Sequence, residues 1–138
     1  MPSEPGSFIG GAVLVHGLWG RPVDWRWVGR LLEDADVQVI TPDLPSHRMS
    51  TAGLADDAAE VREAIRACTP PVAVVGWSYG GSVISLAAAG EGMVARLIYI
   101  SEYRDPQAFR AKISAGSTPI RFLSCTRTED SCSTTTCG

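Results

Sequence analysis

The feature that most constrains the fold of this chain is an apolar run that leads into a glycine-rich turn. Residues 72–75 read Val-Ala-Val-Val, residues 76–80 read Gly-Trp-Ser-Tyr-Gly, and an alanine-rich stretch suited to a helix continues to Ala89. β-branched residues favour strands, and glycine permits a turn too cramped for a side chain. The pattern predicts a strand, a sharp turn and a helix, with the Ser78 hydroxyl held up at the end of a sheet.

Gly-x-Ser-x-Gly in this setting is typical of a serine nucleophile. The serine would lie at the start of a helix, where free N–H groups and the helix dipole stabilise a developing negative charge. A side chain at Gly76 or Gly80 would collide with the neighbouring strand or helix. The strand before the motif, the helix after it and the second glycine at Gly81 make it specific. The alternative is a tight turn that merely contains a serine.

Size and composition indicate one soluble globular domain over residues 1–138. The chain is 45% apolar and has a net charge of −3 with scattered charges, so neither nucleic acid nor a membrane is expected as a partner. No apolar run reaches the roughly 20 residues of a membrane span. The first residues lack the features of a secretory signal, so we expect a cytoplasmic protein. The four cysteines match no zinc pattern, and we expect free thiols and no metal.

Strands and helices are expected to alternate along the chain. Each expected strand is apolar throughout, which is typical of a parallel sheet covered on both faces. Right-handed crossovers then give an α/β fold: a doubly wound, mostly parallel sheet with its site at the carboxyl ends of the strands. The expected strands are residues 11–15, 37–40, 72–75 and 96–101, and the expected helices are residues 25–32, residues 54–68 and the stretch that ends at 89.

Two of the expected helices carry an apolar stripe at helical spacing. The first stripe consists of Trp25, Val28, Leu31 and Leu32. The second consists of Leu54, Ala58, Val61, Ile65 and Cys68, and the charged residues of that helix, Asp57 among them, are placed mostly off it.

The character of the chain changes after the expected core, residues 8–101. Residues 102–125 are treated as a continuation with a short helix at 106–113 and a last strand at 120–125. Residues 126–138, rich in Ser, Thr and Cys, are expected to form a disordered tail. With so few strands, one sheet edge should be uncovered, and we expect marginal stability and self-association through it.

The composition of the tail also suggests a truncated or frameshifted reading frame after about residues 103–130. Translating the parent DNA past residue 103 in the other frames tests this hypothesis. It fails if neither frame encodes apolar strand sequence and a histidine.

With these pieces placed, the chain resembles the α/β-hydrolases, in particular the small esterases of the methylesterase and hydroxynitrile-lyase branch and their bacterial relatives. The resemblance runs from about Ala12 to Ser101. Trp77 departs from the histidine that often precedes the serine in this branch. The matching segments are residues 13–17 (Val-Leu-Val-His-Gly), 41–45 (Thr-Pro-Asp-Leu-Pro), 76–81 (Gly-Trp-Ser-Tyr-Gly-Gly) and 97–100 (Leu-Ile-Tyr-Ile).

The resemblance implies roles for individual residues. Ser78 matches the nucleophile, and the backbone N–H groups of Leu18 and Tyr79 match the oxyanion-hole donors. The run 119–130 resembles the strand and loop that carry the triad acid, which makes Asp130 the candidate acid; the alternative is a charged residue in a solvated tail. The implied activity is hydrolysis of a small carboxylic ester through an acyl-enzyme on Ser78, without a cofactor.

The triad histidine is missing from its expected place. In this fold the order along the chain is serine, acid, histidine, but the two histidines, His16 and His47, both precede Ser78. We expect His16 to hold the oxyanion turn by hydrogen bonding, and His47 to be an exposed loop residue away from the serine. The alternative function is therefore a catalytically impaired remnant, or a module that binds a small ligand without turnover. A hydroxynitrile-lyase-like reaction would need a base as well.

Overall fold

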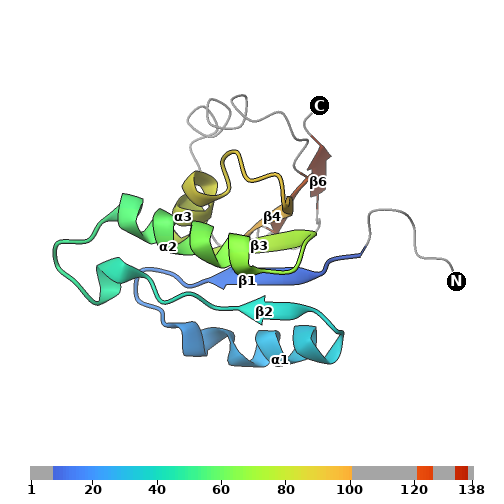
Figure 1. Ribbon diagram of the computed structural model, residues 1–138, viewed down its shortest axis with the longest axis horizontal. Coiled ribbons are helices and arrows are strands. Elements are labelled where there is room, and N and C mark those ends of the chain that lie inside the picture. The colour runs from blue at the N-terminus through green and yellow to red at the C-terminus, as the bar shows by residue number, and fades with distance from the viewer. Residues whose placement is uncertain (1–7, 101–120, 126–132, 137–138) are drawn as a thin grey trace, which may run out of the picture.

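The computed structural model describes residues 8–100, 121–125 and 133–136, the last two segments as backbone strands only (Figure 1). Strands and helices alternate in the described part of the chain, as the sequence predicts. The elements are β1 (Gly11–Val15), the 3-10 turn η1 (Pro22–Trp25), α1 (Arg26–Asp34), β2 (Gln38–Ile40), the 3-10 turn η2 (Pro45–His47), α2 (Leu54–Ala67), β3 (Val72–Trp77), α3 (Tyr79–Ala87), β4 (Val94–Ile100), β5 (Arg121–Cys125) and β6 (Ser133–Thr136).

The strands form one mostly parallel sheet in the order β2-β1-β3-β4-β5-β6. The first five strands are parallel, and β6 runs antiparallel to β5. From β1 the chain moves outward to β2 and then returns to place β3 on the other side of β1. The carboxyl ends of β1 and β3 therefore lie at a topological switch point, where open α/β sheets bind their ligands.

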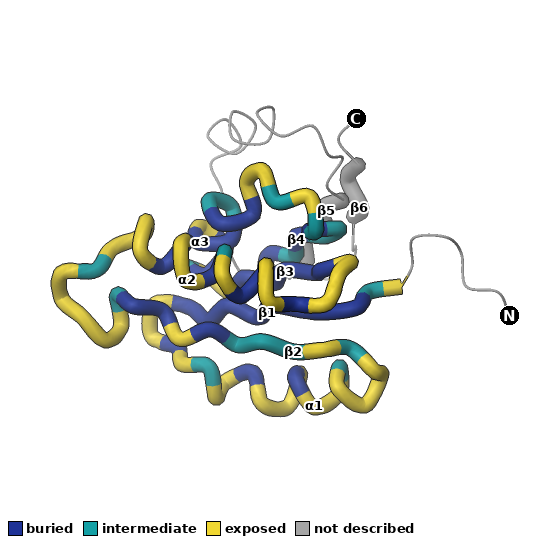
Figure 2. Tube along the Cα trace, in the orientation of Figure 1, coloured by how far each residue is buried: buried dark blue, intermediate teal, exposed yellow. Residues whose placement is uncertain are grey.

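Helices cover both faces of the sheet, which confirms the doubly wound arrangement. α2 and α3 lie on one side and α1 on the other (Figure 1). β1 is buried along its whole length, as Figure 2 shows. The side chains of the sheet divide by alternation: Val13, Val15, Val72 and Val74 face α2 and α3, and Ala12, Leu14 and Val75 face the α1 side.

The stripe expected on the first helix is wrong at two positions. Trp25 is buried and Leu32 packs against the core, but Val28 and Leu31 are 43% and 71% exposed. The buried residue of α1 is Gly29 instead, which faces β2; a Cβ there would lie in ordinary contact with Val39 Cγ1, at 3.5 Å.

The stripe of α2 is confirmed at four of its five positions, since Leu54 alone is exposed. Asp57, one of the charged residues predicted to lie mostly off the stripe, is fully buried. The predicted stripe residues Ala58, Val61, Ile65 and Cys68 are buried, and so is Ala64.

The expected last strand is confirmed as β5, which pairs with β4. The expectation of a disordered tail is wrong for residues 133–136, because this Ser-Thr-Thr-Thr segment forms β6. Threonine is β-branched and favours strands, so four residues suffice once a partner strand is present. The helix expected at 106–113 lies outside the described residues.

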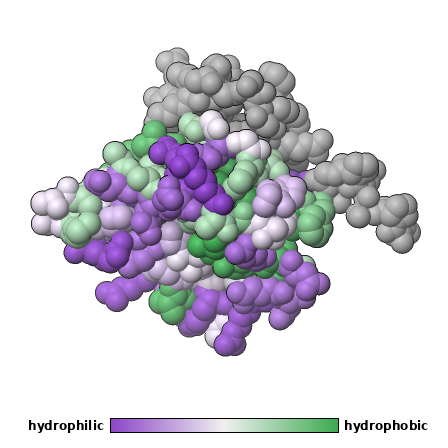
Figure 3. Space-filling view, in the orientation of Figure 1, coloured by the Kyte–Doolittle hydropathy of each residue, from purple (hydrophilic) through white to green (hydrophobic). Residues whose placement is uncertain are grey.

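The described strands leave two edges, β2 and β6. Val39 and Ile40 of β2 are only half-buried, and Figure 3 shows hydrophobic residues between α1 and α2, where the strands lie. Self-association through a sheet edge stays a prediction. Within the residues that the structure describes, no helix combines the length and apolar character that crossing a bilayer requires.

We predict that Gly76→Ala destabilises the fold, because the new Cβ would lie 2.6 Å from the Gly80 carbonyl group. The atoms it meets belong to the backbone of α3, which cannot move as a flexible side chain could. The loss should therefore be about 3 kcal/mol, the upper end of the usual cost of overpacking. Urea unfolding measures it. The control is Gly92→Ala, whose Cβ meets nothing within 4 Å. Equal unfolding midpoints for the two variants would contradict the prediction.

Candidate active site

Ser78 lies on a strained turn between β3 and α3, as the motif predicts. Its backbone has φ 52° and ψ −119°, a region that costs a non-glycine residue of order 1–3 kcal/mol. Two hydrogen bonds hold the turn: the Ser78 N–H donates to the Ile100 carbonyl and the Gly81 N–H donates to the Ser78 carbonyl, both at 2.9 Å. The side chain is exposed at the carboxyl end of the sheet.

The two flanking glycines are required by space, which confirms the expected collisions. A Cβ on Gly76 would lie 2.6 Å from the Gly80 and Gly81 backbone in α3. A Cβ on Gly80 would lie 2.5 Å from the Val15 carbonyl oxygen at the end of β1. β1, β3 and α3 therefore meet at backbone contact, and this contact places the serine beside the loop that follows β1.

That loop brings backbone donors next to the serine. A Cβ on Gly17 would lie 3.4 Å from Ser78 Cβ, so the two residues are direct neighbours. The Leu18 N–H has no hydrogen-bond partner within the described part of the chain. Tyr79 begins α3, and the first N–H groups of a helix have no partner inside it. Both N–H groups are available to an acceptor bound at Ser78.

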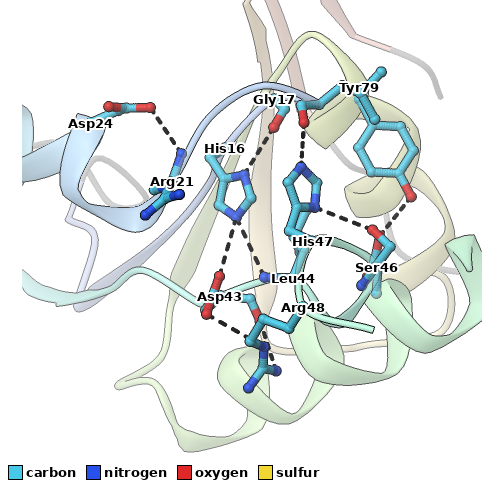
Figure 4. Close-up of polar contacts among 12 residues, drawn as sticks. His16, Gly17, Arg21, Asp24, Asp43, Leu44, Ser46, His47, Arg48 and Tyr79 are labelled. Atoms are coloured by element: carbon cyan, nitrogen blue, oxygen red, sulfur yellow. Dashed lines mark hydrogen bonds and ion pairs between the residues drawn. The ribbon is translucent and has the colours of Figure 1, made fainter. Parts of the chain in front are cut away.

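His16 holds this loop, as expected. The ring is fully buried, its Nδ1–H donates to the Gly17 carbonyl at 2.9 Å, and its Nε2 accepts the Leu44 N–H at 3.4 Å (Figure 4). The Gly17 carbonyl and the Leu18 N–H belong to one planar peptide. The bond from His16 therefore also orients the Leu18 N–H.

His47 lies closer to the site than we expect from its place in the sequence. Its side chain is exposed, but its Nε2–H donates to the Leu18 carbonyl and its ring stands edge-on to that of His16 at 4.7 Å. The Tyr79 ring is 6.4 Å away. The expectation that His47 lies away from the serine is wrong, because η2 folds back across the end of β1 after leaving β2.

Asp57 is the polar residue that sequence reasoning missed. Its buried carboxylate accepts the Ser46 N–H at 2.9 Å, the Ser46 hydroxyl at 2.5 Å and the Tyr79 hydroxyl at 2.7 Å. The helical spacing of residues 57, 61 and 64 on α2 could have revealed its burial. Burial, and then the hydrogen bond and charge of Asp57, raise the pKa of the Tyr79 phenol to about 12.

An open cleft of about 350 Å³ lies over Ser78. Trp19, which is 96% exposed, and Trp77 give it apolar aromatic walls. This size and lining suit a small apolar molecule with a polar group near the serine. The residues around the cleft are Gly17, Leu18, Trp19, Gly20, Asp24, Trp77 and Ser78.

The structure brings together three of the four predicted site residues: Ser78, Leu18 and Tyr79. Asp130 lies outside the described residues. Within residues 8–100 no side chain is hydrogen-bonded to the Ser78 hydroxyl, and both nitrogens of His16 have other partners.

Comparison with known proteins identifies the family. A model described as "Alpha/beta hydrolase family" matches residues 12–129, and the chain belongs to that family. Among curated proteins none matches the sequence significantly.

Several solved structures share the fold. One is an extracellular α/β-hydrolase from a Paenibacillus species, described as homologous in structure and function to tobacco salicylic acid binding protein 2, with TM-score 0.62, 18% identity and coverage of 73% of this chain and 48% of its own. A pyrethroid hydrolase from Sphingobium faniae JZ-2 has TM-score 0.62, 26% identity and coverage of 69% and 40%. A polyneuridine aldehyde esterase has TM-score 0.62, 24% identity and coverage of 72% and 43%. The chain spans less than half the length of each structure.

We predict that Tyr79 ionises at a higher pH than an ordinary tyrosine. Because its pKa in the folded state is about 12, against an ordinary value of about 10, the folded protein holds this proton more tightly. The resulting stabilisation is complete below about pH 10 and is lost as the pH rises from about 10 to 12.

Tyrosinate absorbance of the wild type and of Tyr79→Phe, recorded against pH, tests this. Up to about pH 11 the two curves should coincide, since Tyr79 is still a phenol, and they should separate only near pH 12. A difference that is already complete at about pH 10 would contradict the assignment.

Proposed function

We propose that this chain is a serine hydrolase of the esterase type that cleaves a small carboxylic ester through an acyl-enzyme on Ser78. The observation that carries the proposal is the strained Ser78 turn. It sets an exposed hydroxyl beside the N–H groups of Leu18 and Tyr79, which have no hydrogen-bond partner among the described residues. Strain of this kind is retained where the surrounding structure enforces it, and such positions cluster at active sites.

In the proposed reaction the Ser78 oxygen attacks the ester carbonyl carbon. The carbonyl oxygen becomes an oxyanion, which accepts hydrogen bonds from the N–H groups of Leu18 and Tyr79. Collapse of this intermediate expels the alcohol and leaves the acyl group on Ser78, and water then releases the acid. Each oxyanion donor typically contributes about 2.7–4 kcal/mol to such a step.

The serine proton needs an acceptor during the attack. Both ring nitrogens of His16 are hydrogen-bonded, one to the Gly17 carbonyl and the other to the Leu44 N–H. We therefore assign His16 to holding the turn rather than to proton transfer. Asp130 remains the proposed acid by family resemblance. The described residues supply no base to Ser78.

The cleft favours a small ester with an apolar group. Trp19 and Trp77 supply the apolar walls, and Ser78 lines the same cleft. The similar structures include a pyrethroid hydrolase and an esterase, which agrees with an ester as the substrate class. As partners we propose the ester and a second copy of the chain at a sheet edge.

A second candidate is a binding module that holds a small apolar ligand in this cleft without turnover. The observation that favours it is the Ser78 hydroxyl, which has no hydrogen-bond partner in the described part of the chain. A triad serine is normally bonded to its base, and losing a triad member removes most of the rate.

We predict that the purified chain hydrolyses a short activated ester and that Ser78→Ala removes this activity. Ser50→Ala is the matched control, because the Ser50 side chain is exposed and makes no hydrogen bond within the described part of the chain. Product release is followed with time, and circular dichroism establishes that all three proteins are folded.

Turnover in the wild type and in Ser50→Ala, but not in Ser78→Ala, supports the esterase. Equal rates in all three folded proteins would overturn it. Saturable binding of the ester without Ser78-dependent turnover would instead support the binding module.

A further inference from the structure

The most unusual group outside the serine turn is the buried carboxylate of Asp57. It is fully buried on α2, and an ion taken out of water costs several kcal/mol unless its hydrogen bonds are restored. Three donors restore them here, two from Ser46 and one from Tyr79. Tyr79 directly follows Ser78, and Ser46 precedes His47, which bonds the loop beside the serine.

We infer that Asp57 is a positioning residue that sets both oxyanion donors at once. It would act on one donor through Tyr79, and on the other through Ser46 and His47. This inference rests on the proposed esterase function, because it assigns a role within the same site.

The connection from Asp57 to the Tyr79 donor is direct. The Tyr79 hydroxyl donates to Asp57 Oδ2 at 2.7 Å, which ties the first residue of α3 to α2. The backbone N–H of that same residue is the proposed donor beside Ser78. A fixed phenol limits the shift of the first turn of α3, so the bond to Asp57 restricts the direction of the N–H.

The connection from Asp57 to the Leu18 donor passes through the turn η2. Ser46 donates both its N–H and its hydroxyl to Asp57, so its oxygen is left as an acceptor for His47 Nδ1–H at 3.2 Å. In this arrangement both ring nitrogens of His47 act as donors. At the far side of the ring, Nε2–H donates to the Leu18 carbonyl. Figure 4 shows the His47 ring beside that of His16, with Ser46 on its other side. His47 is thereby held between Ser46 and the oxyanion loop.

The two histidines then fix both peptide planes that flank Leu18. His16 bonds the carbonyl of the Gly17–Leu18 peptide, which carries the donor N–H, and His47 bonds the carbonyl of the next peptide. With both planes fixed, the backbone of Leu18 has little freedom to rotate. An exposed loop residue thus becomes a preorganised donor, which is what transition-state stabilisation requires.

A positioning role differs from a purely structural one in the kinetic parameter it changes. Donors aimed at the oxyanion act in the transition state, so their misalignment lowers kcat and leaves KM nearly unchanged. Loss of fold would instead lower the unfolding midpoint and the fraction of active protein.

The experiment measures kcat, KM and the unfolding midpoint for Tyr79→Phe and His47→Phe with the activated ester. Tyr79→Phe removes only the hydroxyl, and His47→Phe keeps a ring but loses the bond to Leu18. Each should lower kcat about 10-fold, less than the roughly 10²–10³-fold loss caused by removing a donor, with KM near the wild-type value. Asp57→Asn, if it folds, should lower kcat at least as much.

Tyr99→Phe is the matched control, because it removes a tyrosine hydroxyl that bonds Ser85 rather than Asp57. Its kcat should remain that of the wild type. If wild-type turnover depends on Ser78 but Tyr79→Phe and His47→Phe retain full kcat, the positioning role is overturned and the esterase stands. If wild-type turnover does not depend on Ser78, both proposals fall.

Discussion

The site depends on the contact of three backbones with no side chain between them. Gly76 in β3 and Gly80 in α3 leave room for only their own hydrogens, and a Cβ on Gly80 would come within 2.5 Å of the Val15 carbonyl oxygen. This approach forces the intervening Ser78 into a positive φ and presses the loop after β1 against it. The buried valines of β1 and β3 stabilise the contact, and the free energy gained by burying them offsets the strain of the Ser78 turn.

A second layer of polar contacts surrounds this backbone contact. His16 and Asp57 are both fully buried, and each is satisfied by groups that lead to the oxyanion loop or to the first turn of α3. Burial makes such contacts strong and also makes their loss costly, since a single missing partner leaves an unpaired polar atom in the interior. The polar residues of this small core are thus concentrated where donors must be aimed.

The sequence was sufficient for the features set by local pattern. Apolar runs predicted the strands, and the glycine spacing predicted the turn at Ser78. Leu18 and Tyr79 were named from the resemblance to the α/β-hydrolases. His47 and Asp57 were misplaced because their positions depend on how η2 folds back over β1, which no local pattern encodes. Likewise, the four residues of β6 form a strand only because β5 offers an edge to pair with. Asp130 itself lies outside the described residues.

The most direct test of this arrangement is a crystal structure of the chain after reaction with a small phosphonate ester. The tetrahedral phosphorus on the serine oxygen would mimic the intermediate of ester hydrolysis. We predict a phosphonate on Ser78 with one oxygen within hydrogen-bond distance of both the Leu18 and Tyr79 N–H groups, at about 2.7–3.1 Å. A phosphonate attached to another residue, or one on Ser78 whose oxygens all point away from these two N–H groups, would contradict the assignment of nucleophile and oxyanion hole.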